Sequence, residues 1–137
     1  MLVYPVVFTE TKDEKDTVLV FIPDLNGMTE GYGLANAITM AKDYIGNSLY
    51  SKPDSDFPVP SEINAINPES SVFSEAGKSF VSLVDIDINS FRQRKKSKNV
   101  RRNITLPEWL DDMATNEKIN VSAVTQNALK QRLGLLI

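Results

Sequence analysis

The stretch that decides the fold is VFIPDLNGMTEGYGLANAITMAKDYIGNSL, residues 20–49. It opens inside an apolar run at 17–22, which has no polar face and therefore predicts a central strand of a sheet. Glycines at 27, 31 and 33 indicate a tight connection that includes a short strand at 28–32. From residue 34 to residue 49, the apolar side chains fall on one stripe of a helix: Leu34, Ala37, Ile38, Ala41, Ile45 and Leu49. The stretch therefore predicts two strands followed by an amphipathic helix.

The residues on either side complete a module of about 90 residues. β-branched and aromatic residues at 2–9 predict a first strand, in which Pro5 favours an edge position because proline cannot donate a backbone hydrogen bond. Residues 51–71 are rich in Pro, Ser and Asp and predict a long loop. Residues 79–88 predict one more strand, and 89–98 a charged, flexible linker. The expected order of elements is β-β-β-α-β.

Composition excludes several kinds of chemistry. The 137 residues include no cysteine and no histidine, which removes disulfides, thiolate catalysis and the commonest metal ligands. A metal site would have to consist of oxygen ligands alone, and we predict neither a metal nor another cofactor. No apolar run reaches the roughly 18 residues of a membrane span, and the first residues do not resemble a signal peptide. We therefore expect a cytoplasmic protein with no membrane partner.

The net charge of −3 hides a division of the chain into an acidic and a basic part. Residues 1–91 contain 5 Lys and Arg against 14 Asp and Glu, a net charge of −9. Residues 92–137 contain 10 against 4, a net charge of +6. Such asymmetry predicts two modules with different partners, a basic protein for the first and a polyanion for the second. We expect one domain at 1–91, a basic linker at 92–98 and a second domain at 99–137.

The second domain opens with KNVRRNITLP, residues 98–107, in which polar and apolar residues alternate, as in a strand with one solvated face. Pro107 suits the first position of a helix, whose apolar stripe includes Trp109, Leu110 and Met113. Asn120 is a candidate left-handed stop for this helix. Ser122 is then a good N-cap for a second helix at 123–133, which Gly134 closes.

One strand and two helices cannot bury enough apolar surface by themselves, and a lone strand leaves backbone groups unpaired. Two copies of the chain solve both problems if their strands pair antiparallel and their helices pack together. A two-stranded ribbon of this kind fits the major groove of DNA. The sequence therefore predicts a homodimer, or a higher even oligomer, that binds double-stranded DNA.

Within the ribbon, Arg101, Asn103 and Thr105 share one face and are the candidate base-reading residues. Arg binds guanine bidentately, Asn binds adenine, and Thr contacts the thymine methyl. For the DNA phosphates, the candidates are basic side chains and the amides at the start of the second helix: Lys98, Arg102, Ser122 and Ala123. Val100, Ile104 and Leu106 on the other face would form the dimer core.

Two resemblances give these modules a function. Residues 101–133 resemble a ribbon-helix-helix DNA-binding domain, whose base-reading positions fall on Arg101, Asn103 and Thr105 and whose phosphate-clamping cap falls on Ser122. Residues 20–49 resemble the HicB antitoxin core, an apolar strand followed by Pro-Asp-Leu-x-Gly, a short strand, a Gly turn and an Ala-rich helix. The residues that carry this second resemblance are Pro23, Asp24, Leu25, Gly27, Thr29, Glu30, Gly31, Ala35, Ala37 and Ala41, with Met28 where the family often has Cys.

The second resemblance implies an α+β protein with a truncated RNase H-like N-terminal domain and, here, a ribbon-helix-helix domain formed by dimerisation. It also implies a type II antitoxin that inhibits a HicA-like RNA-cleaving toxin and represses the operon it shares with that toxin. An acidic domain suits a basic RNA-binding toxin. Asp24, Asn26 and Glu30 are the candidate toxin-binding residues because they lie on an exposed-looking loop, although the Pro-Asp-Leu segment also fits a purely structural turn.

Three other readings stay open. Residues 99–106 could form a solvated edge strand of the first sheet. The chain could be a stand-alone repressor whose N-terminal domain senses a small ligand. It could also be a metal-dependent nuclease, with Asp85 and Asp87 joined by Asp24 or Asp43. Against catalysis, Val84, Ile86 and Ile88 alternate with the first two aspartates, as on the solvated face of an ordinary strand, so we expect no enzyme.

Overall fold

The computed structural model describes residues 1–12 and 16–135. The chain divides into two compact units, Met1–Lys98 and Asn99–Ile137, called unit 1 and unit 2 here and described separately. The last two residues of the second predicted domain lie outside the described residues. The class is mixed α+β, as expected.

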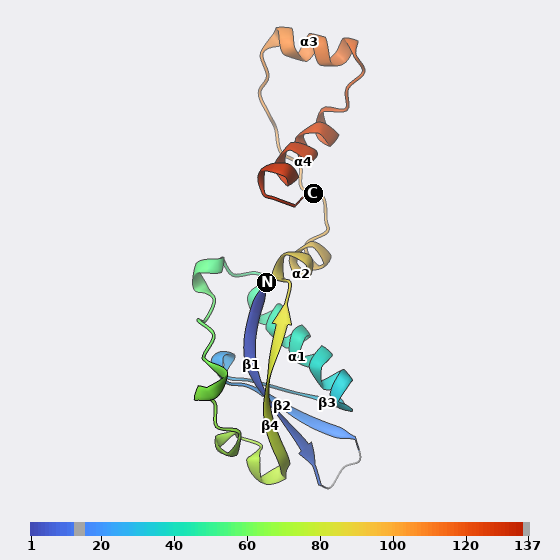
Figure 1. The fold of residues 1–137 in the computed structure, drawn as a ribbon. Helices are drawn as coiled ribbons and strands as arrows, with labels where there is room; N and C mark the ends of the chain where they lie inside the picture. Colours follow the sequence, from blue (N-terminus) through green and yellow to red (C-terminus); the bar gives the residue numbers. More distant parts are fainter. Residues whose placement is uncertain (13–15, 136–137) are drawn as a thin grey trace. The chain divides into compact units, whose positions relative to one another are not determined.

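Unit 1 is built on a four-stranded antiparallel sheet in the order β3-β2-β1-β4 (Figure 1). The strands are β1 (Leu2–Thr11), β2 (Thr17–Ile22), β3 (Gly27–Tyr32) and β4 (Gly77–Ile86). The central place of β2 is confirmed. The edge position predicted from Pro5 is wrong, because β1 lies between β2 and β4. Strand β2 pairs only with residues 7–10 of β1. Pro5 therefore lies beyond the part of β1 that pairs with β2, and its partner is Leu83 of β4.

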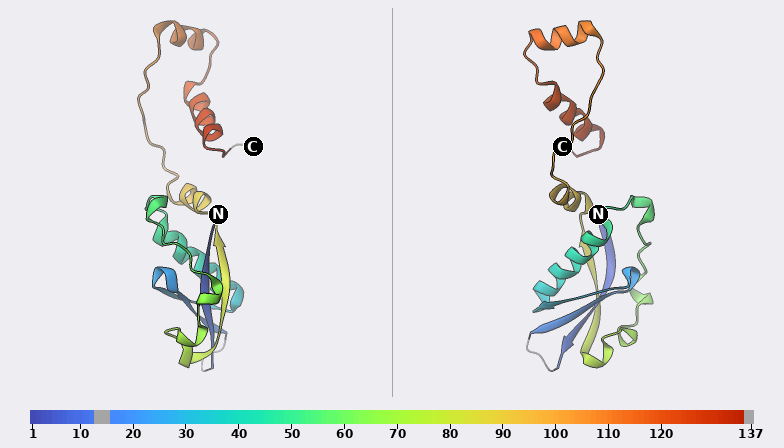
Figure 2. Two further views of the ribbon diagram at one scale, coloured as in Figure 1. Left: turned by 60° about the vertical axis from the view of Figure 1, so that its left-hand side comes forward. Right: turned by 180° about the vertical axis from the view of Figure 1, so that it is seen from behind.

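Helix α1 (Leu34–Leu49) crosses one face of the sheet, as the view from behind in Figure 2 shows. Its bounds are those predicted, and Ala37, Ala41, Ile45 and Leu49 of the predicted stripe are buried. Ile38 of the same stripe is half-buried, and Leu34, the first residue of the helix, is exposed. The helix lies close to β3: a Cβ on Gly31 would come within 2.5 Å of the backbone nitrogen of Ala37.

The predicted long loop lies between α1 and β4 and contains short 3-10 turns: η2 (Asp54–Asp56), η3 (Ile63–Ala65), η4 (Pro68–Ser70) and η5 (Ser74–Ala76). A further turn, η1 (Pro23–Leu25), joins β2 to β3. Side chains hold the loop against the sheet. The Tyr4 hydroxyl donates to the Pro58 carbonyl at 2.7 Å. Ser61 donates its backbone N–H and its hydroxyl to Asp24 at 2.9 and 2.6 Å. We call residues 51–76 the insert.

Residues expected to form a flexible linker are instead helical. Strand β4 ends at Ile86, and α2 (Ile88–Lys95) follows at once. The Asp87 carboxylate caps this helix by accepting from the backbone N–H and hydroxyl of Ser90 at 3.2 and 2.9 Å. These bonds lower the pKa of Asp87, the backbone bond most strongly. Ile88 and Phe91 are buried in the core of unit 1, so α2 belongs to that unit.

Arg92 fastens α2 to the start of the insert. Its guanidinium donates to the carbonyls of Tyr50 at 3.1 Å and Lys52 at 2.7 Å, and it pairs with Asp54 at 2.9 Å. The same group lies 5.4 Å from the centre of the Phe57 ring. Arg92 is therefore a structural residue of unit 1.

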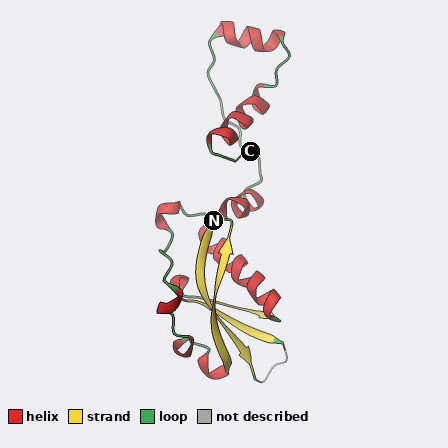
Figure 3. Cartoon of the chain, in the orientation of Figure 1, coloured by secondary structure: helices red, strands yellow, loops and turns green. Residues whose placement is uncertain are grey.

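Unit 2 contains α3 (Glu108–Asn116) and α4 (Val121–Arg132), with residues 99–107 in a drawn-out segment without regular structure (Figure 3). Pro107 is the N-cap of α3 rather than its first helical residue. The left-handed stop is Lys118, with a φ of 54°, and not Asn120. Asn120, and not Ser122, caps α4 by accepting from the Ala123 N–H at 3.0 Å. Gly134 closes α4 with a φ of 73°, as predicted.

Candidate functional site

The candidate base-reading residues lie on the segment that precedes α3. Arg101, Asn103 and Thr105 are all exposed, and no hydrogen bond joins the described part of residues 99–106 to another strand. A strand needs a hydrogen-bonded neighbour, and the predicted neighbour is the same segment of a second chain. The assignment of these three residues to base readout stays a prediction. The alternative of an edge strand in the first sheet is wrong, because the order β3-β2-β1-β4 does not include this segment.

The apolar residues of unit 2 are uncovered. Val100 is 88% exposed, Trp109 64% and Leu133 70%, and none of the described residues from 99 to 135 is buried. The exposed set also contains Ile104, Leu110, Met113, Ile119, Val124, Leu129 and Leu135. Monomeric proteins seldom expose so much apolar surface in one small unit. An exposed apolar surface of this kind is typical of a surface that associates with an apolar partner.

The candidate phosphate contacts are also exposed. Arg102 and Lys98 have exposed side chains, and Ser122 and Ala123 lie in the first turn of α4. In the single chain the Ala123 N–H already donates to the Asn120 side chain. A phosphate at this helix start would therefore compete with the Asn120 cap for that N–H.

The three candidate toxin-binding residues are in different situations. Both carboxylate oxygens of Asp24 accept hydrogen bonds from Ser61, so this residue holds the insert in place. Asn26 is exposed in the left-handed conformation with a φ of 47°, where it ends the turn before β3. Glu30 is exposed on β3, opposite Leu19 of β2. Glu30 is thus the member of the set whose carboxylate is presented on a strand face.

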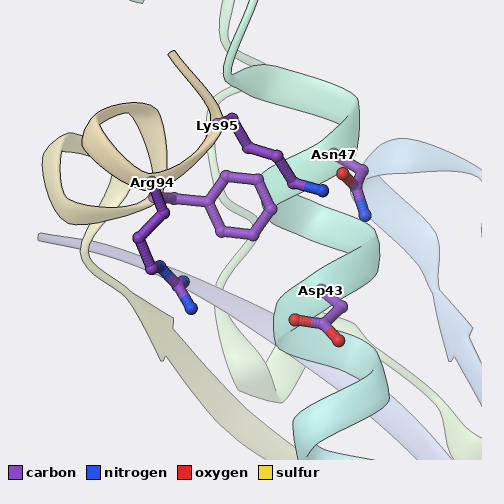
Figure 4. Close-up of a pocket in the computed structure, with 5 residues that line it drawn as sticks. Asp43, Asn47, Arg94 and Lys95 are labelled. Carbon is purple, nitrogen blue, oxygen red and sulfur yellow. The ribbon is translucent and has the colours of Figure 1, made fainter. Parts of the chain in front are cut away.

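Three of the four carboxylates considered for a nuclease, Asp43, Asp85 and Asp87, line one cavity of about 250 Å³, together with Lys42 and Arg94. Asp85 pairs with Lys42 of α1 at 3.4 Å, Asp87 caps α2, and Asp24 binds Ser61. Asp43 lines a groove of about 310 Å³ between α1 and α2 (Figure 4). Within residues 1–12 and 16–135, no three acidic side chains are grouped so that they could hold a metal ion.

The same groove shows where two basic residues of α2 lie. Arg94 and Lys95 extend past the ring of Phe91, 5.2 and 5.6 Å from its centre, and Asn47 faces the groove from α1 (Figure 4). The sequence reading missed this arrangement, because it treated these residues as part of a linker. A buried aromatic residue within the charged run, Phe91, was the available signal for a packed helix.

A feature that the sequence reading did not use is the charge of the insert. Residues 53–77 contain five Asp or Glu and no Lys or Arg, and residues 16–41 contain three and none. These ranges include β2, β3 and most of the insert, so one part of unit 1 accounts for much of its negative charge.

Among the residues that the structure describes, no helix combines the length and the apolar character needed to cross a membrane.

Comparison with known proteins places the chain in a family. A chain of a toxin–antitoxin complex from Streptococcus pneumoniae has the same fold, with a TM-score of 0.58 and 23% identity over 96% of this chain and 98% of that one. The antitoxin HicB of Burkholderia pseudomallei aligns over 98% of both chains with a TM-score of 0.49 and 20% identity. No curated protein matches the sequence significantly. The family model of the HicB-like antitoxin of bacterial toxin–antitoxin systems matches residues 4–132. The chain therefore belongs to the HicB-like antitoxin family.

Proposed function

We propose that this chain inhibits a HicA-like RNA-cleaving toxin through unit 1 and represses their common operon through unit 2, which binds operator DNA as a dimer. The observation that carries the proposal is the contrast between the units. Unit 1 has a net charge of −4 and its own buried core, whereas unit 2 has a net charge of +1 and leaves its apolar residues exposed. Family membership supports the antitoxin role.

The exposed apolar surface supports a dimer of unit 2. Pairing of residues 99–106 with the same segment of a second chain would satisfy their backbone groups and bring Val100 and Ile104 together between the helices. The opposite face of the ribbon would then carry Arg101, Asn103 and Thr105 in duplicate, which suits a DNA site with two-fold symmetry. In this function Lys98, Arg102, Ser122 and Ala123 contact phosphates and fix the position of the ribbon on the DNA.

The acidic charge of unit 1 supports a basic partner. A toxin that cleaves RNA presents a cationic surface to its polyanionic substrate, and an acidic protein can cover that surface while electrostatic attraction speeds the encounter. Asp24, Asn26 and Glu30 remain the candidate contact residues. In this function, no metal ion or other cofactor takes part on the antitoxin side.

Toxin binding is tested by co-expressing the tagged chain with the small protein encoded beside it. We expect the two to co-purify, and the chain to restore growth of cells that express the neighbour alone. A neighbour that neither arrests growth nor binds the chain would contradict the antitoxin function.

Operator recognition is tested with Asn103→Ala. Loss of a bidentate contact to adenine should weaken binding to the chain's own upstream DNA by about 1–3 kcal/mol and leave non-specific binding nearly unchanged. Asn89→Ala, an exposed residue of α2, is the matched control and should bind normally. Equal operator affinity of the two variants would contradict base readout by Asn103.

A further inference from the structure

The sheet of unit 1 has a second face, away from α1, that is only partly covered. The close contacts of Gly27 and Gly31 with α1 fix which side of β3 faces that helix. Because successive strand residues point to opposite faces, Met28 and Glu30 lie on the other side. Their partners in β2 are Phe21 and Leu19. The insert reaches this face only in part, since Phe21 and Leu19 are half-buried while Met28 is 51% exposed.

A small cavity opens on this face between the sheet and the insert. Val7, Phe21 and Pro23 line it from the sheet side, and Ala65, Ile66 and Ser70 from the insert. Its volume is about 170 Å³, and an apolar cavity of about 150 Å³ holds a benzene ring in another protein. The cavity can therefore accept one large apolar side chain. Tyr32, 69% exposed at the end of β3, and Met28 extend the apolar surface beyond the cavity.

The segments 16–41 and 53–77, which supply most of the residues that line the cavity, carry acidic residues and no basic ones. Two exposed carboxylates, Glu62 and Glu69, flank the cavity-lining part of the insert in the sequence. Glu30 stands on the sheet surface between Met28 and Tyr32 along β3. The nearest basic residues along the chain, Lys15, Lys42, Lys52 and Lys78, lie outside both segments that form this surface. An apolar centre with an anionic rim favours a cationic protein partner.

We infer that this face, formed by β2, β3 and residues 62–70 of the insert, is where the cationic toxin docks, with one apolar toxin side chain in the cavity and Lys or Arg residues against Glu30, Glu62 and Glu69. The inference rests on the proposed antitoxin function. A buried apolar anchor with a charged rim is the usual arrangement of a tight interface, in which the anchor slows dissociation and the rim speeds association. On this basis the insert, and not only the loop at 24–30, contributes to toxin recognition.

The test uses the full-length chain and the toxin encoded beside it, with binding rates measured by surface plasmon resonance. Ala65→Trp places a large side chain at the cavity mouth without removing buried atoms, because Ala65 is exposed. We expect the dissociation constant to rise at least about tenfold, mostly through faster dissociation. Ala35→Trp is the matched control, since Ala35 is an exposed residue of α1, on the other face of the sheet; it should bind within about twofold of the unmodified chain.

A charge variant tests the rim independently of packing. Glu62→Lys should lower the association rate at least about threefold at low salt, and the difference should shrink at high salt. Asp112→Lys in α3 makes the same change of net charge in unit 2 and should have no effect on toxin binding. Amide hydrogen exchange of β1 and β2 checks that each variant keeps unit 1 folded. If Ala65→Trp does not fold, Glu62→Lys alone tests the interface.

The outcomes separate the inference from the function on which it rests. An unmodified chain that fails to bind the toxin would contradict the antitoxin function and with it this interface. Binding by the unmodified chain that is unchanged in both Ala65→Trp and Glu62→Lys would overturn only the inference, and would place the toxin elsewhere on unit 1.

Discussion

Unit 1 and unit 2 differ in where their apolar residues are. Unit 1 buries Tyr4, Phe8 and Ile45 completely between its sheet and α1. Unit 2 also carries apolar residues on both of its helices, among them Trp109 and Leu129, yet none of its described residues is buried. A unit that buries its own core folds by itself, whereas one that exposes its apolar face depends on association for stability. The difference supports the proposal that this chain combines a domain with its own core and a second unit that is completed by association.

The chain contains natural probes that separate the two units. Trp109, the one tryptophan, is in unit 2, and all four tyrosines are in unit 1. Tryptophan fluorescence therefore follows unit 2, and tyrosine fluorescence follows unit 1. We predict that dilution below the dimer dissociation constant changes the tryptophan fluorescence and leaves the tyrosine fluorescence unchanged.

The largest effect is expected from Ile104→Asp. In the proposed dimer Ile104 lies in the core of the ribbon, where an unpaired carboxylate is costly to bury. We expect loss of the dimer in sedimentation velocity and an operator affinity at least about 100-fold lower, equivalent to roughly 3 kcal/mol. Ile104→Val is the control and should keep the dimer. If the Ile104→Asp chain stays dimeric, the proposed pairing of the two strands is wrong. Unit 2 would then not depend on this ribbon for its stability.

A slightly smaller effect is expected from Gly31→Ala in unit 1. The added methyl group would lie 2.5 Å from the backbone nitrogen of Ala37, so β3 and α1 must move apart. We expect a loss of about 2–3 kcal/mol in the free energy of unfolding, measured in urea by tyrosine fluorescence. Gly134→Ala is the control in unit 2, where the added methyl group meets no neighbour. Because the backbone of Gly134 is left-handed, Ala is disfavoured there, and we expect a change in the unfolding of unit 2 alone, seen in the tryptophan signal. A tyrosine transition unchanged by Gly31→Ala would contradict the close packing of α1.

Arg92→Ala tests whether α2 belongs to unit 1. The variant loses the guanidinium hydrogen bonds to the carbonyls of Tyr50 and Lys52, and the free energy of unfolding should fall by about 2 kcal/mol. Arg92→Lys should not restore it, because an ammonium group cannot make both bonds in the geometry of the planar guanidinium. Arg94→Ala on the same helix is the control and should cost at most about 1 kcal/mol. Amide hydrogen exchange of residues 88–95 should accelerate only in the Arg92 variants. Equal exchange in Arg92→Ala and Arg94→Ala would mean that this segment is a linker after all.

The smallest effect is expected from Tyr4→Phe, which removes the bond to the Pro58 carbonyl and should cost about 1 kcal/mol. Burial, with a smaller contribution from the charge of Asp24, raises the pKa of Tyr4. The folded state therefore favours the neutral phenol, so this contribution is complete below the ordinary tyrosine pKa of about 10 and is lost as the pH rises through the raised value. The free energy of unfolding should therefore fall between neutral and alkaline pH in the unmodified chain. The same fall is expected in Tyr32→Phe, the control at an exposed site, but not in Tyr4→Phe.

The elements with strong local patterns were predictable. Helix α1 has the predicted bounds because its apolar residues recur at the helical period. Helix α2 was missed because a charged run with two apolar anchors, Ile88 and Phe91, has too weak a period to predict a helix. It is held by contacts from residues about 40 positions earlier in the chain. The cap of α4 was misplaced because Asn120 and Ser122 are about equally good N-caps.

The sequence by itself determined the α+β class, the order of the strands and α1, the division of charge and the resemblance to the HicB family, because these depend on local periodicity, composition and short motifs. Only the tertiary structure decided that β1 is interior, that Asp24 and Arg92 hold the insert and α2 in place, and that an acidic face with an apolar cavity remains open on the sheet. Those features depend on contacts between residues far apart in the chain, which no local pattern encodes. The base-reading role of Arg101, Asn103 and Thr105 depends on contacts with a second chain, and it awaits the tests above.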